Sequence, residues 1–252
     1  MDKLGRCTSR HVRTLSLVVT AVDDFTGSVI MGSQARVWIE GEKPPIKKPE
    51  GWYVFLDLPA GEYTVLAEGG FYNRSSCVCT IEDGNYKNIK IRLTPGRNAP
   101  LEAGTCCIEG STDPKTAVCI RPADRSLSYK LLTDVSVGAD SIGIYHPDGI
   151  DIEGKLFCIV SEGKEEFIRV SSVEKGSRLE YRLHTPLVGS YPKIGTLIYP
   201  VSESCADEKG KFFVPVRGIP EKTVEFICTR TEEPEKRCTF ALTMGNRVRI
   251  EV

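Results

Sequence analysis

Residues 51–65 read Gly-Trp-Tyr-Val-Phe-Leu-Asp-Leu-Pro-Ala-Gly-Glu-Tyr-Thr-Val, and this stretch decides the fold of the first part of the chain. Residues 51–58 are aromatic and branched, which is typical of a strand. Residues 59–61, Pro-Ala-Gly, supply a tight connection, and a second strand follows at 62–68. We interpret the stretch as a hairpin in which Tyr63 returns to the core. Because apolar side chains alternate to both sides of the first strand, we expect both of its faces to be covered.

Similar short runs surround this stretch and are separated by turn residues such as Asp83-Gly84. At 15–22, four apolar residues lie on one side of an extended chain, which favours a half-buried strand over a secretory signal. We expect further strands at 34–40, 75–82 and 87–93. No 11-residue window has a helical apolar period. Many short strands between turns predict a β-sandwich.

The order of these segments resembles the carboxypeptidase regulatory-like domain over residues 14–94. The residues that carry the resemblance are the strands Leu15 to Val19 and Ala35 to Ile39 and, above all, the run Asp57-Leu58-Pro59-Ala60-Gly61-Glu62-Tyr63. The resemblance implies a transthyretin-like sandwich. Zinc peptidases that carry such a domain bind metal through a His-x-x-Glu pair in a separate domain. No histidine of this chain is followed at the third place by glutamate, so the resemblance implies a fold and no catalysis.

The composition of 94–100 indicates a linker, and a second β-unit follows it. Its opening strand begins near residue 105, whereas the counterpart of the aromatic stretch comes only at 207–216. We therefore expect one discontinuous β-sandwich, made of 101–123 plus 200–252, into which 124–199 is inserted. Insertions at exposed loop tips are readily tolerated.

The inserted segment has a β-pattern of its own. Glu162-Gly163 predicts a hairpin between 156–160 and 167–173, and every second residue from Leu179 to Leu183 is apolar. The run of segments from Leu132 to Thr196 resembles a small β-module of phage-tail and tail-like proteins, which implies a compact β-roll or barrel. The predicted fold class is therefore all-β, with transthyretin- or Ig-like β-sandwiches and an inserted small β-roll or barrel.

Composition excludes some classes of function. The 33 Lys and Arg residues balance 34 Asp and Glu residues, for a net charge of -1, which argues against nucleic-acid binding. No apolar run reaches the 18 or more residues that a membrane span needs, so we expect no membrane insertion. Ten cysteines could form disulfides in a secreted protein. Since Cys158 and Cys228 stand in apolar strand contexts, we interpret most as reduced core residues and predict a cytoplasmic protein.

No residue pattern indicates a catalytic centre, a metal site or a cofactor. The three histidines lack metal-ligand spacing, and Cys106-Cys107 with Cys119 offers no Cys-x-x-Cys pair. The carboxylates of 148–153 lack the calcium-loop pattern and fit turns better. The Gly-x-Ser-x-Gly elbow and the phosphate-binding glycine loop are missing. We predict that the protein is not an enzyme, although sequence leaves a glycosidase carboxylate pair open.

Two features are candidate contact sites. An aromatic pair follows Gly69-Gly70 in an expected loop, and residues 1–13 form a basic arm that could dock on an acidic partner. The candidate contact residues are Phe71, Tyr72, Arg6, Arg10 and Arg13.

These observations lead to one functional hypothesis and one alternative. The hypothesis is a non-enzymatic structural or accessory subunit of a bacterial phage-tail-like, contractile-injection assembly, which binds other protein subunits and possesses edges for self-association. The alternative is a carbohydrate-binding or adhesive β-sandwich module that uses the aromatic pair Phe71-Tyr72.

Overall fold

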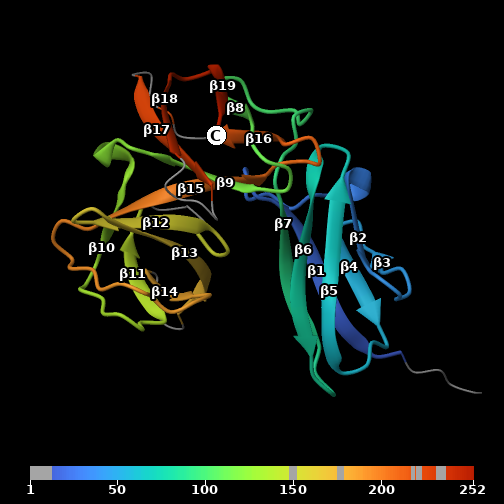
Figure 1. Ribbon diagram of the computed structural model, residues 1–252. Helices are drawn as coiled ribbons and strands as arrows, with labels where there is room; N and C mark the ends of the chain where they lie inside the picture. Colours follow the sequence, from blue (N-terminus) through green and yellow to red (C-terminus); the bar gives the residue numbers. More distant parts are fainter. Residues whose placement is uncertain (1–12, 148–151, 175–178, 217–218, 220–222, 231–236) are drawn as a thin grey trace, which may run out of the picture. The chain divides into compact units, whose positions relative to one another are not determined.

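The computed structural model describes residues 13–147, 152–174, 179–216, 219, 223–230 and 237–252 (Figure 1). The predicted all-β class is confirmed, since the helices in these ranges are two 3-10 turns, Gly32–Gln34 and Arg125–Leu127. None of the helices in this part of the chain is long and apolar enough to cross a membrane. The chain divides into two compact units, Met1–Pro100 and Leu101–Val252.

The first unit is a sandwich of two sheets with the strand orders β3-β4-β1-β7 and β2-β5-β6. Strands β1 and β7 are parallel, and the other pairs are antiparallel. The predicted strands are present, and the sequence reading missed the short β3. The bounds are β1 Leu15–Asp23, β2 Ala35–Ile39, β3 Ile46–Lys47, β4 Trp52–Leu56, β5 Gly61–Gly69, β6 Tyr72–Ile81 and β7 Lys87–Leu93.

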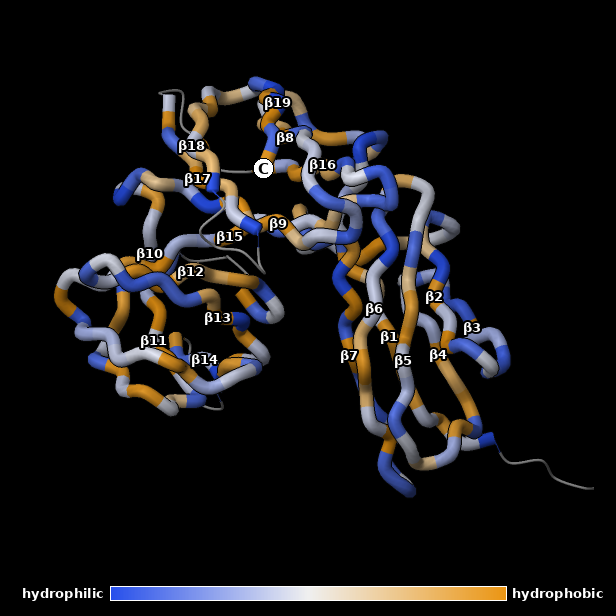
Figure 2. Tube along the Cα trace, viewed as in Figure 1, coloured by the Kyte–Doolittle hydropathy of each residue, from blue (hydrophilic) through white to orange (hydrophobic). Residues whose placement is uncertain are grey.

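Period-two alternation builds the core of this sandwich. Leu17, Val19 and Ala21 of β1 are fully buried, and Val65 and Ala67 of β5 face them from the other sheet. Orange segments recur along these strands in Figure 2. Each sheet therefore contributes one apolar face to a closed core.

The connection at 57–60 is not the turn of a hairpin, which corrects the sequence prediction. It carries the chain from β4 in one sheet to β5 in the other. Asp57, at φ 59°, donates its N–H to the Thr14 carbonyl, and its Oδ1 accepts from the Thr14 N–H at 2.7 Å. The Tyr63 hydroxyl donates to the Pro59 carbonyl at 2.9 Å. The Pro-Ala-Gly sequence predicts that the chain reverses direction here. It does not predict which sheet the next strand joins, because that depends on the core against which Val65 packs.

The second unit contains a nine-stranded sheet, β10-β11-β14-β13-β12-β15-β9-β17-β18, and a three-stranded sheet, β16-β8-β19. The bounds are β8 Cys106–Ser111, β9 Ala117–Pro122, β10 Tyr129–Leu131, β11 Ser141–Tyr145, β12 Leu156–Ser161, β13 Lys164–Val173, β14 Glu180–Leu183, β15 Leu197–Cys205, β16 Lys211–Val216, β17 Val224–Arg230, β18 Arg237–Leu242 and β19 Arg247–Glu251.

Six strands of the large sheet close into a barrel. Strand β10 pairs with β11 on one side and with β15 on the other, so that β10, β11, β14, β13, β12 and β15 form a ring. Phe157, Ile144 and Ile198 are buried inside it. The predicted hairpin is confirmed: Glu162 at φ 48° and Gly163 at φ 80° join β12 to β13. Positive φ at both turn residues matches a two-residue hairpin turn.

Strand β15 belongs to both the barrel and the second sandwich. Its first half, Leu197 to Val201, pairs with β12, and its second half, Ser202 to Cys205, pairs with β9. Strands β9, β17 and β18 continue this sheet and share a core with β16, β8 and β19. The expected boundary between 199 and 200 thus lies inside one continuous strand.

Candidate interaction surfaces

The aromatic pair predicted as a loop contact is divided between the surface and the core. Phe71 lies on the turn after β5 and is 43% exposed. Tyr72 is the first residue of β6, is half-buried and packs against the core of the first sandwich. Its hydroxyl donates to Oδ2 of Asp23 at 3.1 Å. Burial, followed by the Asp23 carboxylate, raises the pKa of Tyr72 to about 12. The expectation of a shared exposed pair is therefore wrong for Tyr72.

The basic arm is mostly outside the described residues. Arg6 and Arg10 lie outside the described residues, and Arg13 is exposed two residues before the start of β1. The carboxylates at 148 and 151 also fall outside the described residues. In the part of the chain that the structure describes, no group of three or more His, Cys, Asp or Glu side chains is arranged to hold a metal.

The outer face of the sheet β3-β4-β1-β7 carries an apolar surface that sequence reasoning missed. Trp52 is 49% exposed and Ile46 43% exposed, and both point away from the core. Register places Ile46 opposite Val54, which lies opposite Val18 of β1, and Trp52 lies opposite Thr20. We call Ile46, Trp52, Val54, Leu56, Leu15 and Val18 the outer apolar face.

The expectation that both faces of the aromatic strand are covered is thus wrong, since only the Tyr53 and Phe55 side is buried.

Polar residues continue the same face along β7. Asn88 lies opposite Val18, and Lys90 lies opposite Thr20. Both are exposed. An apolar centre next to a polar margin is the composition of a protein–protein contact, because the centre loses water while the margin stays solvated. The arrangement is suited to binding another protein surface.

The outer face of the opposite sheet is different, because its tryptophan is covered by cations. The Arg36 and Arg74 guanidinium carbons lie 5.0 and 5.3 Å from the centre of the Trp38 ring. Arg74 also forms an ion pair with Glu40 at 3.6 Å. The charged groups shield this indole and leave a solvated surface.

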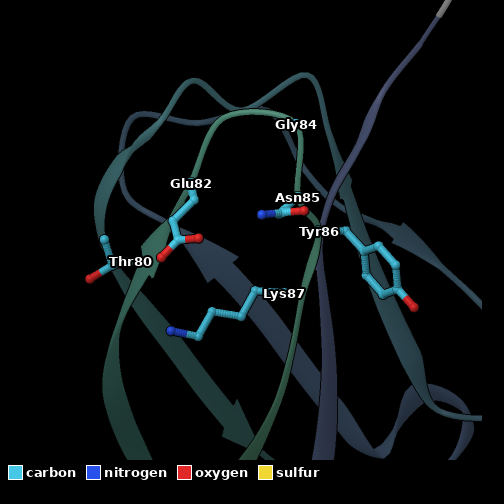
Figure 3. Close-up of a pocket in the computed structure, with 6 residues that line it drawn as sticks. All are labelled: Thr80, Glu82, Gly84, Asn85, Tyr86 and Lys87. Carbon is cyan, nitrogen blue, oxygen red and sulfur yellow. The ribbon is translucent and has the colours of Figure 1, made fainter.

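A polar hollow lies where β6 turns into β7, at the end of the first sandwich (Figure 3). It is lined by Thr80, Glu82, Gly84, Asn85, Tyr86 and Lys87. Figure 3 shows Glu82, Asn85 and Lys87 extending into the opening between the strands, whereas Tyr86 points away from it. These exposed groups can form hydrogen bonds and ion pairs with a ligand.

Two arginine–glutamate pairs in the second unit, one buried and one partly exposed, neutralise charges within that unit. Arg121 is 6% exposed and donates to Oε1 of Glu165 at 2.6 Å, and its guanidinium lies over the Tyr199 ring. Arg169 forms two hydrogen bonds of 2.7 Å with the Glu203 carboxylate. Each pair joins two strands that are not adjacent in the sheet, β9 and β13 for Arg121–Glu165 and β13 and β15 for Arg169–Glu203. The charges of these pairs are therefore already neutralised within the unit.

No family model and no curated protein matches this chain. Among solved structures, the TIE protein of Bacillus anthracis is similar at a TM-score of 0.28 and 15% identity, over 95% of this chain and 34% of that one. BcpA, the major pilin subunit of Bacillus cereus, is similar at a TM-score of 0.26 and 11% identity, over 93% of this chain and 69% of that one. GBS52, the minor pilin of Streptococcus agalactiae, is similar at a TM-score of 0.22 and 11% identity, over 94% of this chain and 93% of that one. This chain spans about a third of the TIE protein. At such TM-scores the likeness carries no argument about function.

Proposed function

We propose that this protein is a non-enzymatic structural or adhesive subunit that acts through contacts with other protein subunits. The observation that carries the proposal is the outer apolar face. Large exposed apolar patches on a protein surface often mark interaction sites. The face is built on a rigid sheet, so it can be presented without a conformational change.

The finer proposal is that the assembly is a bacterial phage-tail-like, contractile-injection particle that forms in the cytoplasm. It rests on the resemblance of residues 132–196 to a small β-module of tail proteins. The closed ring of β10 to β15 is compatible with such a module. The carbohydrate-binding alternative depended on two exposed aromatic residues, and Phe71 is the only one of the pair that is exposed.

The experiment is native purification of the tagged protein from the cells that make it, with negative-stain microscopy and mass spectrometry of its companions. We expect particles or stoichiometric partner subunits. Trp52→Ser removes the largest side chain of the outer apolar face and should weaken this association at least tenfold, because a buried tryptophan is a frequent binding hot spot.

The matched control is Val78→Ser. Val78 is 62% exposed on β6, in the other sheet, and should leave the association unchanged. Recovery of a lone monomer would contradict the proposal. Companions that persist with Trp52→Ser would show that another surface makes the contact, and companions unrelated to tail particles would refute the finer proposal.

A further inference from the structure

Two thiols face each other across the last pair of strands in the nine-stranded sheet. Cys228 of β17 and Cys238 of β18 are directly opposed in the antiparallel register. Phe226 and Phe240, two residues away, are also opposed, and their rings stack at 6.2 Å. Both cysteines pack against the core of the second sandwich, Cys228 fully buried and Cys238 half-buried. Their side chains therefore occupy the same side of the sheet.

The geometry of this pair matches that of a disulfide. Directly opposed residues of an antiparallel pair have Cα atoms about 4.5 to 5.5 Å apart, and disulfides span about 4.4 to 6.8 Å. The side chains of the two cysteines are in hydrogen-bond contact with each other. The register thus places the two cysteines within the span that a disulfide bridges.

The other described cysteines lack this arrangement. Cys119 lies opposite Thr229 and Glu203, and Cys158 lies opposite Phe167 and Tyr199. Cys77 and Cys79 are successive residues on one face of β6, opposite Val65 and Tyr63. Among the strand pairs that the structure describes, Cys228 and Cys238 are the one cross-strand pair that joins two cysteines.

We propose that Cys228 and Cys238 form a reversible disulfide when the protein meets a low-molecular-weight disulfide such as oxidised glutathione. The half-buried Cys238, as a thiolate, attacks one glutathione sulfur and releases one glutathione thiolate. Cys228 then attacks the Cys238 sulfur, and its proton passes to the departing thiolate, which leaves as the second glutathione. Two protein thiols are oxidised to one disulfide, and one oxidised glutathione is reduced to two glutathione molecules. This proposal is independent of the proposed function.

The bond would fasten an edge strand. Strand β18 ends the nine-stranded sheet and is held there by its pairing with β17. A disulfide across this pair restricts the unfolded chain and should raise the melting temperature of the second unit by roughly 5 to 10 °C.

The test is a peptide map of the full chain after incubation with oxidised glutathione. The protein is blocked with N-ethylmaleimide in denaturant, digested with trypsin without reduction and analysed by mass spectrometry. Cleavage after lysine and arginine places Cys228 in residues 223–230 and Cys238 in 238–247. We expect these two peptides to be linked, and dithiothreitol to separate them.

Melting curves of the oxidised and reduced protein complete the test. The rise in melting temperature should occur in the wild type and in Cys205→Ser, an exposed control, and should be lost in Cys238→Ser. A map with both peptides alkylated, with glutathione retained on Cys238, or with either cysteine joined to a different one would overturn the proposal. The wild-type map decides the question even if the Cys238→Ser variant fails to fold.

Discussion

Tyr72 shows at the scale of one residue how a candidate contact becomes part of the fold. Its hydroxyl joins β6 to Asp23 at the end of β1, whereas the adjacent Phe71 stays on the surface. Two neighbouring aromatic residues after two glycines look equivalent in sequence. They differ because strand β6 begins at Tyr72, after Phe71. The Asp23 that accepts from the Tyr72 hydroxyl is more than 40 residues away in the sequence.

The raised pKa of Tyr72 predicts a pH dependence. In the unfolded chain this tyrosine ionises near pH 10, and in the folded protein its pKa is about 12. The folded state therefore holds the proton more tightly, and the contribution of Tyr72 is present below pH 10 and is lost as the pH rises from 10 to 12. The free energy of unfolding in urea should fall more over this range for the wild type than for Tyr72→Phe.

Tyr72→Phe should also cost about 1 kcal/mol at pH 7, because the hydrogen bond to Asp23 disappears. Phe71→Ala, the adjacent control, should change the free energy of unfolding by less than about 0.5 kcal/mol. Equal losses for the two variants would mean that Tyr72 is not anchored by its hydroxyl.

Gly110 limits the packing of a whole element, strand β8. A Cβ at this position would lie 2.1 Å from Cζ of Phe212 and 2.8 Å from the Ile250 carbonyl oxygen. Gly110→Ala should therefore lower the free energy of unfolding of the second unit by roughly 1 to 3 kcal/mol, because the core has no room for the added methyl group. Urea unfolding of the full chain measures the loss.

Gly70→Ala is the matched control, since a Cβ there would have nothing within 4 Å. It should leave stability unchanged or slightly improved, because alanine restricts the unfolded chain. If Gly110→Ala were equally harmless, β8 could not be in close contact with the Phe212 ring.

At the element scale, sequence predicts features that neighbours along the chain determine. The Glu162-Gly163 turn follows from two residues, and β1 follows from alternation within one run. The link from β4 to β5 was misread because sheet membership depends on distant partners. The outer apolar face was missed for the same reason: Ile46 is a single apolar residue among prolines and lysines until it is placed beside Val54.

At the scale of the whole molecule, strand β15 couples the barrel of the second unit to the second sandwich. Because the barrel and the second sandwich share this strand, loss of the barrel should expose one edge of β9. Phe157→Ala, in the barrel core, should cost about 3 to 5 kcal/mol. Hydrogen exchange should then show that amides of β9 lose protection together with those of β12.

The control for this coupling is Phe71→Ala, which removes an exposed ring and should leave the protection of both strands unchanged. Retained protection of β9 in Phe157→Ala would mean that the sandwich is stable without the barrel. Sequence patterns predicted an inserted module, but they contain no sign that a single strand serves both structures.

In each unit, the first and last of the described strands lie side by side and parallel. Residues Leu17 to Asp23 pair with Lys87 to Leu93, and Cys107 to Ser111 pair with Arg247 to Glu251. Tension applied to the start of the first strand and the end of the last would slide the two past each other, so that their hydrogen bonds share the force and do not break one at a time. In a single-molecule stretching experiment, both units should rupture at forces well above those of a sheet pulled open from one end. A chain built in this way can transmit tension along its length.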